Sequence, residues 1–183
     1  MSEYTPEIYE DENGGQPFVK FFESLPKHKQ DLLEATILER LSLLGIGLCQ
    51  EKSHGRQLGG GLFEVKTEAT ESEVKGLYED RDVAVPEGVG GDVLLRTFCH
   101  AFGEKRILLL HGYDKGLNPK HKKQQQEIEK ARKHLKAWQQ AQNKQKAADR
   151  KRPPTAADLA TRAAAAVART FAAWIEKFKK RKK

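Results

Sequence analysis

Residues 93–116 read VLLRTFCHAFGEKRILLLHGYDKG, and their pattern decides the fold that is expected for the chain. Two apolar runs of strand length, Val93–Phe102 and Lys105–Tyr113, are separated by Gly103-Glu104. A two-residue loop with glycine at its first central position is typical of a tight β-hairpin. The stretch therefore predicts two antiparallel strands that end in polar side chains.

Alternation along the two strands places several polar side chains on one face of this hairpin, because successive side chains of a strand point to opposite sides. Arg, His, Tyr and Lys side chains are expected to converge there. The residues expected on this face are Arg96, Phe98 and His100 from the first strand, and Leu109, His111, Tyr113 and Lys115 from the second.

The segments before the hairpin predict one strand, two helices and a loop. Pro17 and Pro26 each precede an amphipathic pattern, and proline is favoured at a first helical position. The apolar side chains then recur at helical spacing, so both helices are expected to pack onto a sheet. The expected elements are an edge strand at 3–9, helices at 17–25 and 26–44, and a polar, glycine-rich loop at 46–61.

Residues 62–67 alternate as a strand with one buried face does. Phe63 and Val65 lie on one face of this strand, and Lys66 lies on the other. If the apolar pair faces the helices, Lys66 lies on the same side of the sheet as Arg96. The strand therefore adds a second basic side chain to the polar face.

The connection between this strand and the hairpin is long and acidic. Residues 68–92 contain eight Asp or Glu residues against Lys75 and Arg81. Its length and its excess of carboxylates favour a disordered loop, with a lid over the neighbouring face as the alternative.

Charge is distributed unevenly along the 183 residues, whose formal net charge is +7. Residues 120–183 hold 20 Lys or Arg and 5 Asp or Glu, which gives +15, and the remaining 13 minus 21 gives −8 for residues 1–119. An anionic partner is therefore expected to bind mainly at the C-terminal third.

The C-terminal third predicts two helices. Residues 120–142 are rich in Lys, Gln, Glu and Ala, and a thin apolar stripe is expected to dock this first helix on the sheet. We expect the main domain to cover residues 1–138, a linker to cover 139–154, and a basic amphipathic helix to cover 155–183. That last helix is expected to pack or self-associate, with an acidic membrane or a nucleic acid as the alternative.

Several function classes are disfavoured. The chain has no run of apolar residues long enough to span a membrane and no signal-peptide pattern at its start, so a cytoplasmic location without membrane association is expected. Cys49 and Cys99 are isolated and lack metal-ligand spacing, which favours reduced thiols and predicts no metal site.

The order of these segments resembles the RelE/ParE superfamily of small toxins from toxin–antitoxin modules, and is most similar to its phage-derived, HigB-like branch. The expected fold is α+β, with a small antiparallel sheet packed against an N-terminal helix pair and a C-terminal helical extension. The resemblance covers roughly residues 17–138. It is carried by FVKFFESLPKHKQDLLEATILERLSLLG, GGGLFEVK, LLRTFCHAFGEKRILLLHGYDKG and QQQEIEKARKHLKAW, in that order.

The resemblance implies a type II toxin that cleaves messenger RNA on the ribosome without a metal or other cofactor, and that a cognate antitoxin neutralises. Attack of a 2′-hydroxyl on phosphate needs a base, an acid and cations. Lys66 and Arg96 would hold the phosphate, His111 or Tyr113 would transfer protons, and Lys115 would stabilise charge. The lysines expected to bind RNA are Lys120, Lys122, Lys123, Lys130 and Lys133.

Each of these side chains also has a purely structural interpretation. Arg96 could pair with Glu64 within the sheet, His111 could be a satisfied, partly buried histidine, and Tyr113 could be a core aromatic. Two other functions therefore stay open: a ParE-like inhibitor of gyrase, and a non-catalytic, phage-derived nucleic-acid-binding protein that acts through its basic tail.

Overall fold

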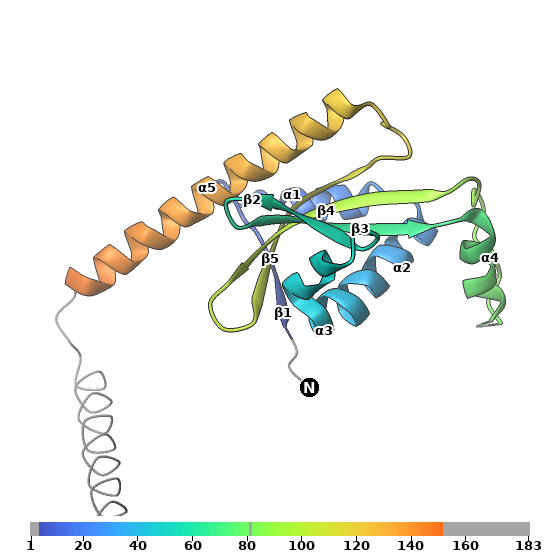
Figure 1. Cartoon of the computed structure of the whole chain (residues 1–183), viewed down its shortest axis with the longest axis horizontal. Helices are drawn as coiled ribbons and strands as arrows, with labels where there is room; N and C mark the ends of the chain where they lie inside the picture. The colour runs from blue at the N-terminus through green and yellow to red at the C-terminus, as the bar shows by residue number, and fades with distance from the viewer. Residues whose placement is uncertain (1–3, 81, 152–183) are drawn as a thin grey trace, which may run out of the picture. The chain divides into compact units, whose positions relative to one another are not determined.

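The computed structural model describes residues 4–80 and 82–151. The chain divides into two compact units, Met1–Gln140 and Ala141–Lys183. The first unit has an α+β fold with a five-stranded mixed sheet (Figure 1). Within the described residues, no helix is both long and apolar enough to cross a membrane.

The sheet contains both antiparallel and parallel pairs. Its order is β1-β5-β4-β3-β2, and the pairs are antiparallel except for β1 with β5, which is parallel. The expectation of a wholly antiparallel sheet is therefore wrong at this edge, because the last strand of the hairpin returns beside the first strand of the chain. The strands are β1 (Thr5–Ile8), β2 (Gly55–Gly59), β3 (Leu62–Ala69), β4 (Val93–Phe102) and β5 (Arg106–Asp114).

The two helices predicted before the sheet are present. Helix α1 (Pro17–Glu23) begins at its proline, and the second helix is continuous from α2 (Lys27–Ala35) through the π-helical η1 (Thr36–Leu41) to α3 (Ser42–Leu44). Gly45 ends it with a φ of +55°, in a region that glycine enters readily. The 3-10 helix η2 (Gly45–Gln50) follows.

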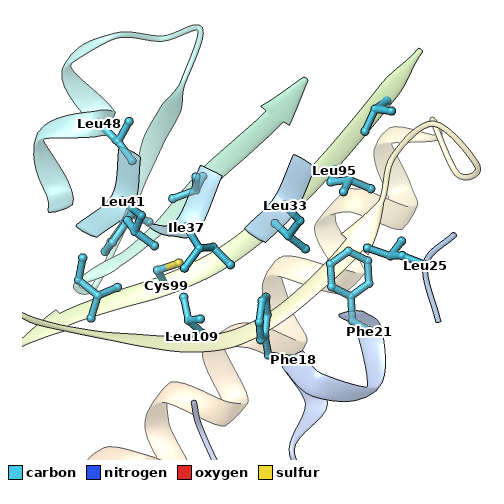
Figure 2. Packing of buried hydrophobic residues seen from close by; sticks show 14 of the residues in the cluster. Phe18, Phe21, Leu25, Leu33, Ile37, Leu41, Leu48, Leu95, Cys99 and Leu109 are labelled. Carbon is cyan, nitrogen blue, oxygen red and sulfur yellow. The ribbon is translucent and has the colours of Figure 1, made fainter. Parts of the chain in front are cut away.

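One face of the sheet packs against these helices. Leu33, Ile37 and Leu41 extend from the second helix toward Cys99 and Leu109 of the sheet (Figure 2). Burial of such a side chain contributes about 1.5–3 kcal/mol. The fully buried members of this core include Leu33, Leu41, Phe63, Val74, Val93, Leu95, Cys99 and Ile107.

The opposite face is covered by α5 (His121–Lys151). Its apolar stripe contributes Ile128, Ala131 and Leu135 to a second buried cluster, as the sequence predicted. The helix continues through residues 139–151, where a linker was predicted. The predicted basic helix at 155–183 lies outside the described residues.

The predicted loop at 46–61 contains a strand that sequence reasoning missed. Strands β2 and β3 form a hairpin in which Gly59 pairs with Leu62, and the intervening Gly60 and Gly61 have φ values of +62° and +78°. Positive φ at both central positions is characteristic of a type I′ turn, for which Gly-Gly is suitable. The glycine run was the signal for this hairpin.

The acidic connection at 68–92 is not wholly disordered, because it contains helix α4 (Glu71–Glu79). Thr70 accepts a hydrogen bond from the Glu73 amide, and Glu73 accepts one from the Thr70 amide, which together form a capping box. Val74 is fully buried and packs α4 against the helix-side core. Helix α4 lies beyond one end of β3 and β4 (Figure 1).

Strands β4 and β5 form the predicted hairpin with two local differences. Phe102 pairs with Arg106, so the loop has three residues rather than two. A β-bulge lets Phe98 pair with His111 while Cys99 pairs with Leu109, leaving Leu110 as the extra residue. The prediction that Leu109 shares a face with His111 is therefore wrong, because Leu109 packs in the helix-side core.

Gly112 provides a test of how closely α1 packs on β5. An added Cβ would collide with the ring of Phe21 and lie 3.1 Å from the carbonyl oxygen of Arg96. We expect Gly112→Ala to lower the free energy of unfolding by about 1–3 kcal/mol in urea denaturation, because the site is already filled.

Gly76→Ala in α4 is the matched control. Among the described residues, no atom beyond the adjoining chain lies within 4 Å of a Cβ built there. Alanine is also the better helix former, by about 1 kcal/mol. Equal stability of the Gly112→Ala variant and the wild type would contradict the close packing of α1 on β5.

Candidate functional site

The predicted phosphate-binding residue Arg96 lies within a buried charge cluster. Its guanidinium is only 3% exposed, with Nη2 2.5 Å from Glu68 and Nε 3.6 Å from the buried carboxylate of Glu64. Arg56 Nε approaches the same Glu64 carboxylate at 3.2 Å, and the Gln124 amide donates to it at 3.2 Å. Arg96 therefore pairs with Glu64 within the sheet, which was the structural interpretation given as an alternative to phosphate binding.

The two other predicted basic residues of the hairpin region are not brought together with Arg96 in one open site. Lys66 lies opposite Arg96 in the β3–β4 ladder, but its ammonium donates to the carbonyl oxygen of Lys52 at 2.5 Å. Lys115 follows the end of β5, where its amide donates to the carbonyl oxygen of Leu94. The five predicted catalytic residues therefore lie in different surroundings and do not form one open site.

His111 and Tyr113 instead line an open groove of about 480 Å³. Strand β1 pairs only as far as Leu109, so within residues 4–80 and 82–151 no strand lies beside the last part of β5 on that side. Helix α1 contributes Lys20 to the groove, and α5 forms another wall. The groove lies where the end of β5 meets α1 and α5. Its polar and charged side chains are Lys20, Ser24, His111, Tyr113, Asp114, Asn118, Lys123, Glu127, Lys130 and His134.

Glu127 is the central charge of the groove. Its side chain is 3% exposed and contacts Lys123 Nζ at 2.8 Å, Lys130 Nζ at 2.9 Å and His111 Nε2 at 2.6 Å. Burial alone would raise the pKa of Glu127, but these three hydrogen bonds outweigh it and lower the pKa to about 2. Glu127 is therefore an anion surrounded by cationic and N–H groups.

His111 is held as a neutral imidazole. Burial lowers its pKa below the usual value, and the hydrogen bond with Glu127 opposes this only in part. Because its partner is a carboxylate, Nε2 carries the proton and Nδ1 carries the lone pair. Nδ1 is buried and has no hydrogen-bond partner among the described residues.

Tyr113 keeps its proton at neutral pH. Burial, followed by the nearby charge of Glu64, raises the pKa of its phenol to about 12. The ring stacks on Phe98 with centroids 6.0 Å apart and is 6% exposed. Its hydroxyl has no hydrogen-bond partner in the part of the chain that the structure describes. The phenol thus keeps a proton that it shares with no partner among these residues, and its oxygen is buried in this conformation.

His134 is a site residue that sequence reasoning missed. Its ring lies 6.2 Å from that of His111 and 5.2 Å from that of Tyr9, and it lines the groove. Burial, then the proximity of His111, lowers the pKa of His134. The signal was a polar stripe on one face of α5, in which Lys123, Glu127, Lys130 and His134 recur at helical spacing.

The predicted RNA-binding lysines fall into two groups. Lys123 and Lys130 line the groove and pair with Glu127, whereas Lys120, Lys122 and Lys133 are exposed. The positive charges of Lys123 and Lys130 are thus partly neutralised by the carboxylate of Glu127. Over the described residues, no cluster of three or more His, Cys, Asp or Glu side chains is arranged to hold a metal ion.

The groove can bind an anionic group and transfer protons. It combines two neutral imidazoles, a protonated phenol and ammonium groups within one surface.

Comparison of the sequence with protein-family models finds no match, and comparison with curated proteins finds none either.

Replacement of Glu127 tests the electrostatic balance of the groove. We expect Glu127→Gln to lower the free energy of unfolding by about 1.5–3 kcal/mol at neutral pH, as for lost hydrogen bonds to a charged group. The pKa of this carboxyl falls from 4.5 to about 2 on folding, so its stabilisation is present above about pH 4.5 and is lost as pH falls toward 2.

The measurement is urea unfolding of both proteins over a series of pH values. The stability difference between the wild type and Glu127→Gln should shrink between pH 4.5 and 2. Glu129→Gln, on the exposed side of the same helix, is the matched control and should change little. A difference that does not depend on pH would contradict the role assigned to Glu127.

Proposed function

We propose that this chain is a RelE/ParE-like toxin of a type II toxin–antitoxin module, and that it cleaves messenger RNA without a metal ion. The observation that carries the proposal is the groove at the end of β5. There, His111, Tyr113 and His134 lie beside three lysines, Lys20, Lys123 and Lys130. These are the groups that RNA cleavage through a 2′-hydroxyl requires.

The arrangement of the elements also supports the proposal. A strand, two helices, antiparallel strands and a helix follow one another along the chain, with β2 and α4 as additional elements. This is the order on which the resemblance to RelE/ParE toxins rests. The RelE-like character of the fold is part of the proposal.

The chemistry assigns different roles to the two imidazoles. His134 is neutral and lines the groove, so it can accept the proton of the attacking 2′-hydroxyl. Tyr113 would donate its phenolic hydrogen to the phosphate or to the departing 5′-oxygen after RNA binding uncovers its hydroxyl, which is buried in this conformation. His111 has its Nε2 bound to Glu127 and its Nδ1 covered, so it acts as a positioning residue in this conformation.

The proposed partners follow from this activity. Messenger RNA on the ribosome would bind across the groove and the exposed lysines of α5, of which Lys120, Lys122 and Lys133 are examples. A cognate antitoxin would neutralise the toxin in the cytoplasm. Arg96 would support the sheet beneath the groove through Glu64 and Glu68, and would not itself contact the phosphate.

Tyr113→Phe is the sharpest test of catalysis, because it removes one oxygen that makes no hydrogen bond among the described residues. The variant should therefore fold as well as the wild type. Cleavage of messenger RNA on programmed ribosomes by the purified chain should fall about 10²-fold or more in the variant, as expected for loss of a proton donor.

His134→Gln should cause a similar loss, and His121→Gln, an exposed histidine at the start of α5, should cause none. Arg96→Ala is a poor test, because it leaves Glu64 buried without this partner and so destabilises the fold. Unchanged cleavage by both groove variants, or intact RNA with the wild type, would contradict the proposed nuclease. Intact RNA accompanied by DNA damage in expressing cells would indicate gyrase inhibition.

A non-catalytic nucleic-acid-binding protein is the second candidate. It is favoured by the burial of Arg96, whose guanidinium is already bound by two carboxylates. Binding would then depend on the basic surface of α5, since phosphate contacts supply most of non-specific affinity.

This candidate predicts binding without cleavage. The wild type should bind a single-stranded oligonucleotide with a steep dependence on salt, and leave it intact. Lys122→Ala with Lys133→Ala should weaken binding and reduce that salt dependence, whereas Tyr113→Phe should not. Fluorescence anisotropy over a salt series measures both, and cleavage of the same RNA would exclude the candidate.

A further inference from the structure

Three aromatic rings lie together where the tip of the β4–β5 hairpin meets α5. The rings of His100 and Phe102 on β4 are nearly parallel, with centroids 6.3 Å apart and an interplanar angle of 6°. The ring of Trp138 on α5 is tilted by 67° to both, with its centroid 5.6 Å from that of His100 and 4.7 Å from that of Phe102. These three rings, here named the ring cluster, are only partly buried, and none of them lines the groove.

The chain around the ring cluster fixes its geometry. His100 Nδ1 donates to the carbonyl oxygen of Gly61 at 2.9 Å, and a Cβ added at Gly61 would lie only 3.0 Å from the imidazole. Arg106 pairs with Phe102 in the β4–β5 ladder, and its guanidinium carbon lies 4.8 Å from the centre of the Phe102 ring. A cation over an aromatic face is attracted to it. The rings are therefore held in place before any partner binds.

Two guanidinium groups border the ring cluster. Arg132 donates from Nη2 to the carbonyl oxygen of Leu58 at 2.5 Å, and Leu58 packs in the same cluster as two of the rings. Within residues 4–80 and 82–151 no carboxylate pairs with Arg132, so its positive charge is left for an anion. Arg106 pairs with Glu7, but these side chains are 51% and 31% exposed. An exposed ion pair contributes little, so a phosphate can compete for Arg106.

The surface around the ring cluster is only weakly positive. Its flanking charges come from the edge strand, the hairpin tip and the exposed side of α5. They are Lys105, Arg106, Arg132, Lys136, Glu7, Glu104 and Glu129, which gives +4 minus 3, or +1. Because this excess is small, attraction to charge alone would bind a polyanion weakly. The rings have to supply most of the affinity for any partner.

Aromatic side chains beside a guanidinium are suited to an unpaired nucleobase and its phosphate. Every base has a flat π face, and stacking of one base on an aromatic side chain changes affinity by roughly 5- to 150-fold. Arginine is suited to the position beside such rings, because it binds phosphate and also stacks on aromatic faces. In a duplex the base faces are covered by neighbouring base pairs, so a single strand is the form that fits.

We propose that the ring cluster and Arg132 form a second contact surface for single-stranded RNA, in which one unpaired base stacks on Trp138 and the adjoining phosphate lies at Arg132. The choice of RNA rests on the proposed function, whereas the stacking does not depend on the groove. Trp138 lies 11 residues (138 minus 127) beyond Glu127 on α5, which is roughly 16 Å along the helix. A strand of about ten nucleotides, spaced by about 3.4 Å when stacked, is long enough to reach both.

Fluorescence anisotropy with a ten-nucleotide oligouridylate measures this contact. The 2′-hydroxyls of the probe are methylated, so the proposed nuclease cannot cleave it and binding is measured apart from catalysis. The full chain should bind this probe at least about fivefold more tightly than a strand of the same length that lacks its bases. In an NMR titration of the wild type, the indole N–H signal of Trp138 should shift as the probe binds.

Substitutions at Trp138 separate stacking from packing. Trp138→Leu keeps an apolar side chain but has no π face, so affinity for the probe should fall at least about fivefold. Trp138→Phe keeps an aromatic face and should bind within about twofold of the wild type. Phe22→Leu is the matched control, because Phe22 is also partly buried but packs on the helix-side face of the sheet. Urea unfolding of each variant checks that the fold is retained.

Arg132→Gln tests the phosphate contact. The glutamine amide can still donate to the carbonyl oxygen of Leu58, but the positive charge is lost. Affinity for the probe should fall, and the slope of log affinity against log salt should decrease by about 1. Arg40→Gln is the matched control, because Arg40 is exposed on η1 at the other face of the sheet, and it should change neither quantity.

Three results would each overturn the proposal. The first is an indole signal of Trp138 that does not shift at saturation with the probe. The second is equal affinity of Trp138→Leu and the wild type. The third is an equal loss of affinity in Trp138→Leu and Trp138→Phe, which would show that Trp138 only anchors α5.

The outcome is distinguishable from that of the nuclease proposal. Weaker probe binding by Trp138→Leu, together with intact messenger RNA on ribosomes treated with the wild type, would support this surface and contradict the nuclease. Cleavage by the wild type, with unchanged probe binding by Trp138→Leu, would contradict this surface alone.

Discussion

The β-bulge at Leu110 is the constraint on which the groove depends. Without it, the strict alternation of β5 would put His111 on the same face as Leu109, which packs among the helices. The extra residue lets Leu109 remain in that core while His111 and Tyr113 point toward α5. One inserted residue thus lets neighbouring parts of β5 contribute to both faces of the sheet. Bulges often change the direction of side chains near functional sites in this way.

The short length of β1 has a complementary effect. Because β1 pairs with β5 only up to Leu109, the last residues of β5 are left for α1 and α5 to flank. Lys29 in α2 reaches Asp114 at 2.5 Å and secures that end of β5 from the helix side. The groove is therefore formed at the end of a sheet strand that α1, α2 and α5 contact, rather than on a loop.

Buried carboxylates organise the cations of this unit. Glu64 holds Arg56 and Arg96 within the sheet, and Glu127 holds Lys123, Lys130 and His111 at the groove. Removal of Glu64 would leave the buried guanidinium of Arg96 with Glu68 as its remaining carboxylate partner. Two of the three groove lysines, Lys123 and Lys130, come from the basic segment 120–183, and Arg96 is held within the sheet by Glu64 and Glu68.

Local patterns were sufficient for the helices 17–25 and 26–44, the strand from Leu62, the hairpin and the apolar stripe of α5, because each depends on periodicity or capping within one segment. Local signals also existed for β2 and α4, in Gly60-Gly61 and in Thr70 with Glu73, although composition and length favoured loops there. The parallel pairing of β1, the bulge at Leu110 and the burial of Arg96 were decided only in three dimensions. They depend on contacts between segments far apart in the chain, as does the position of His134 beside His111.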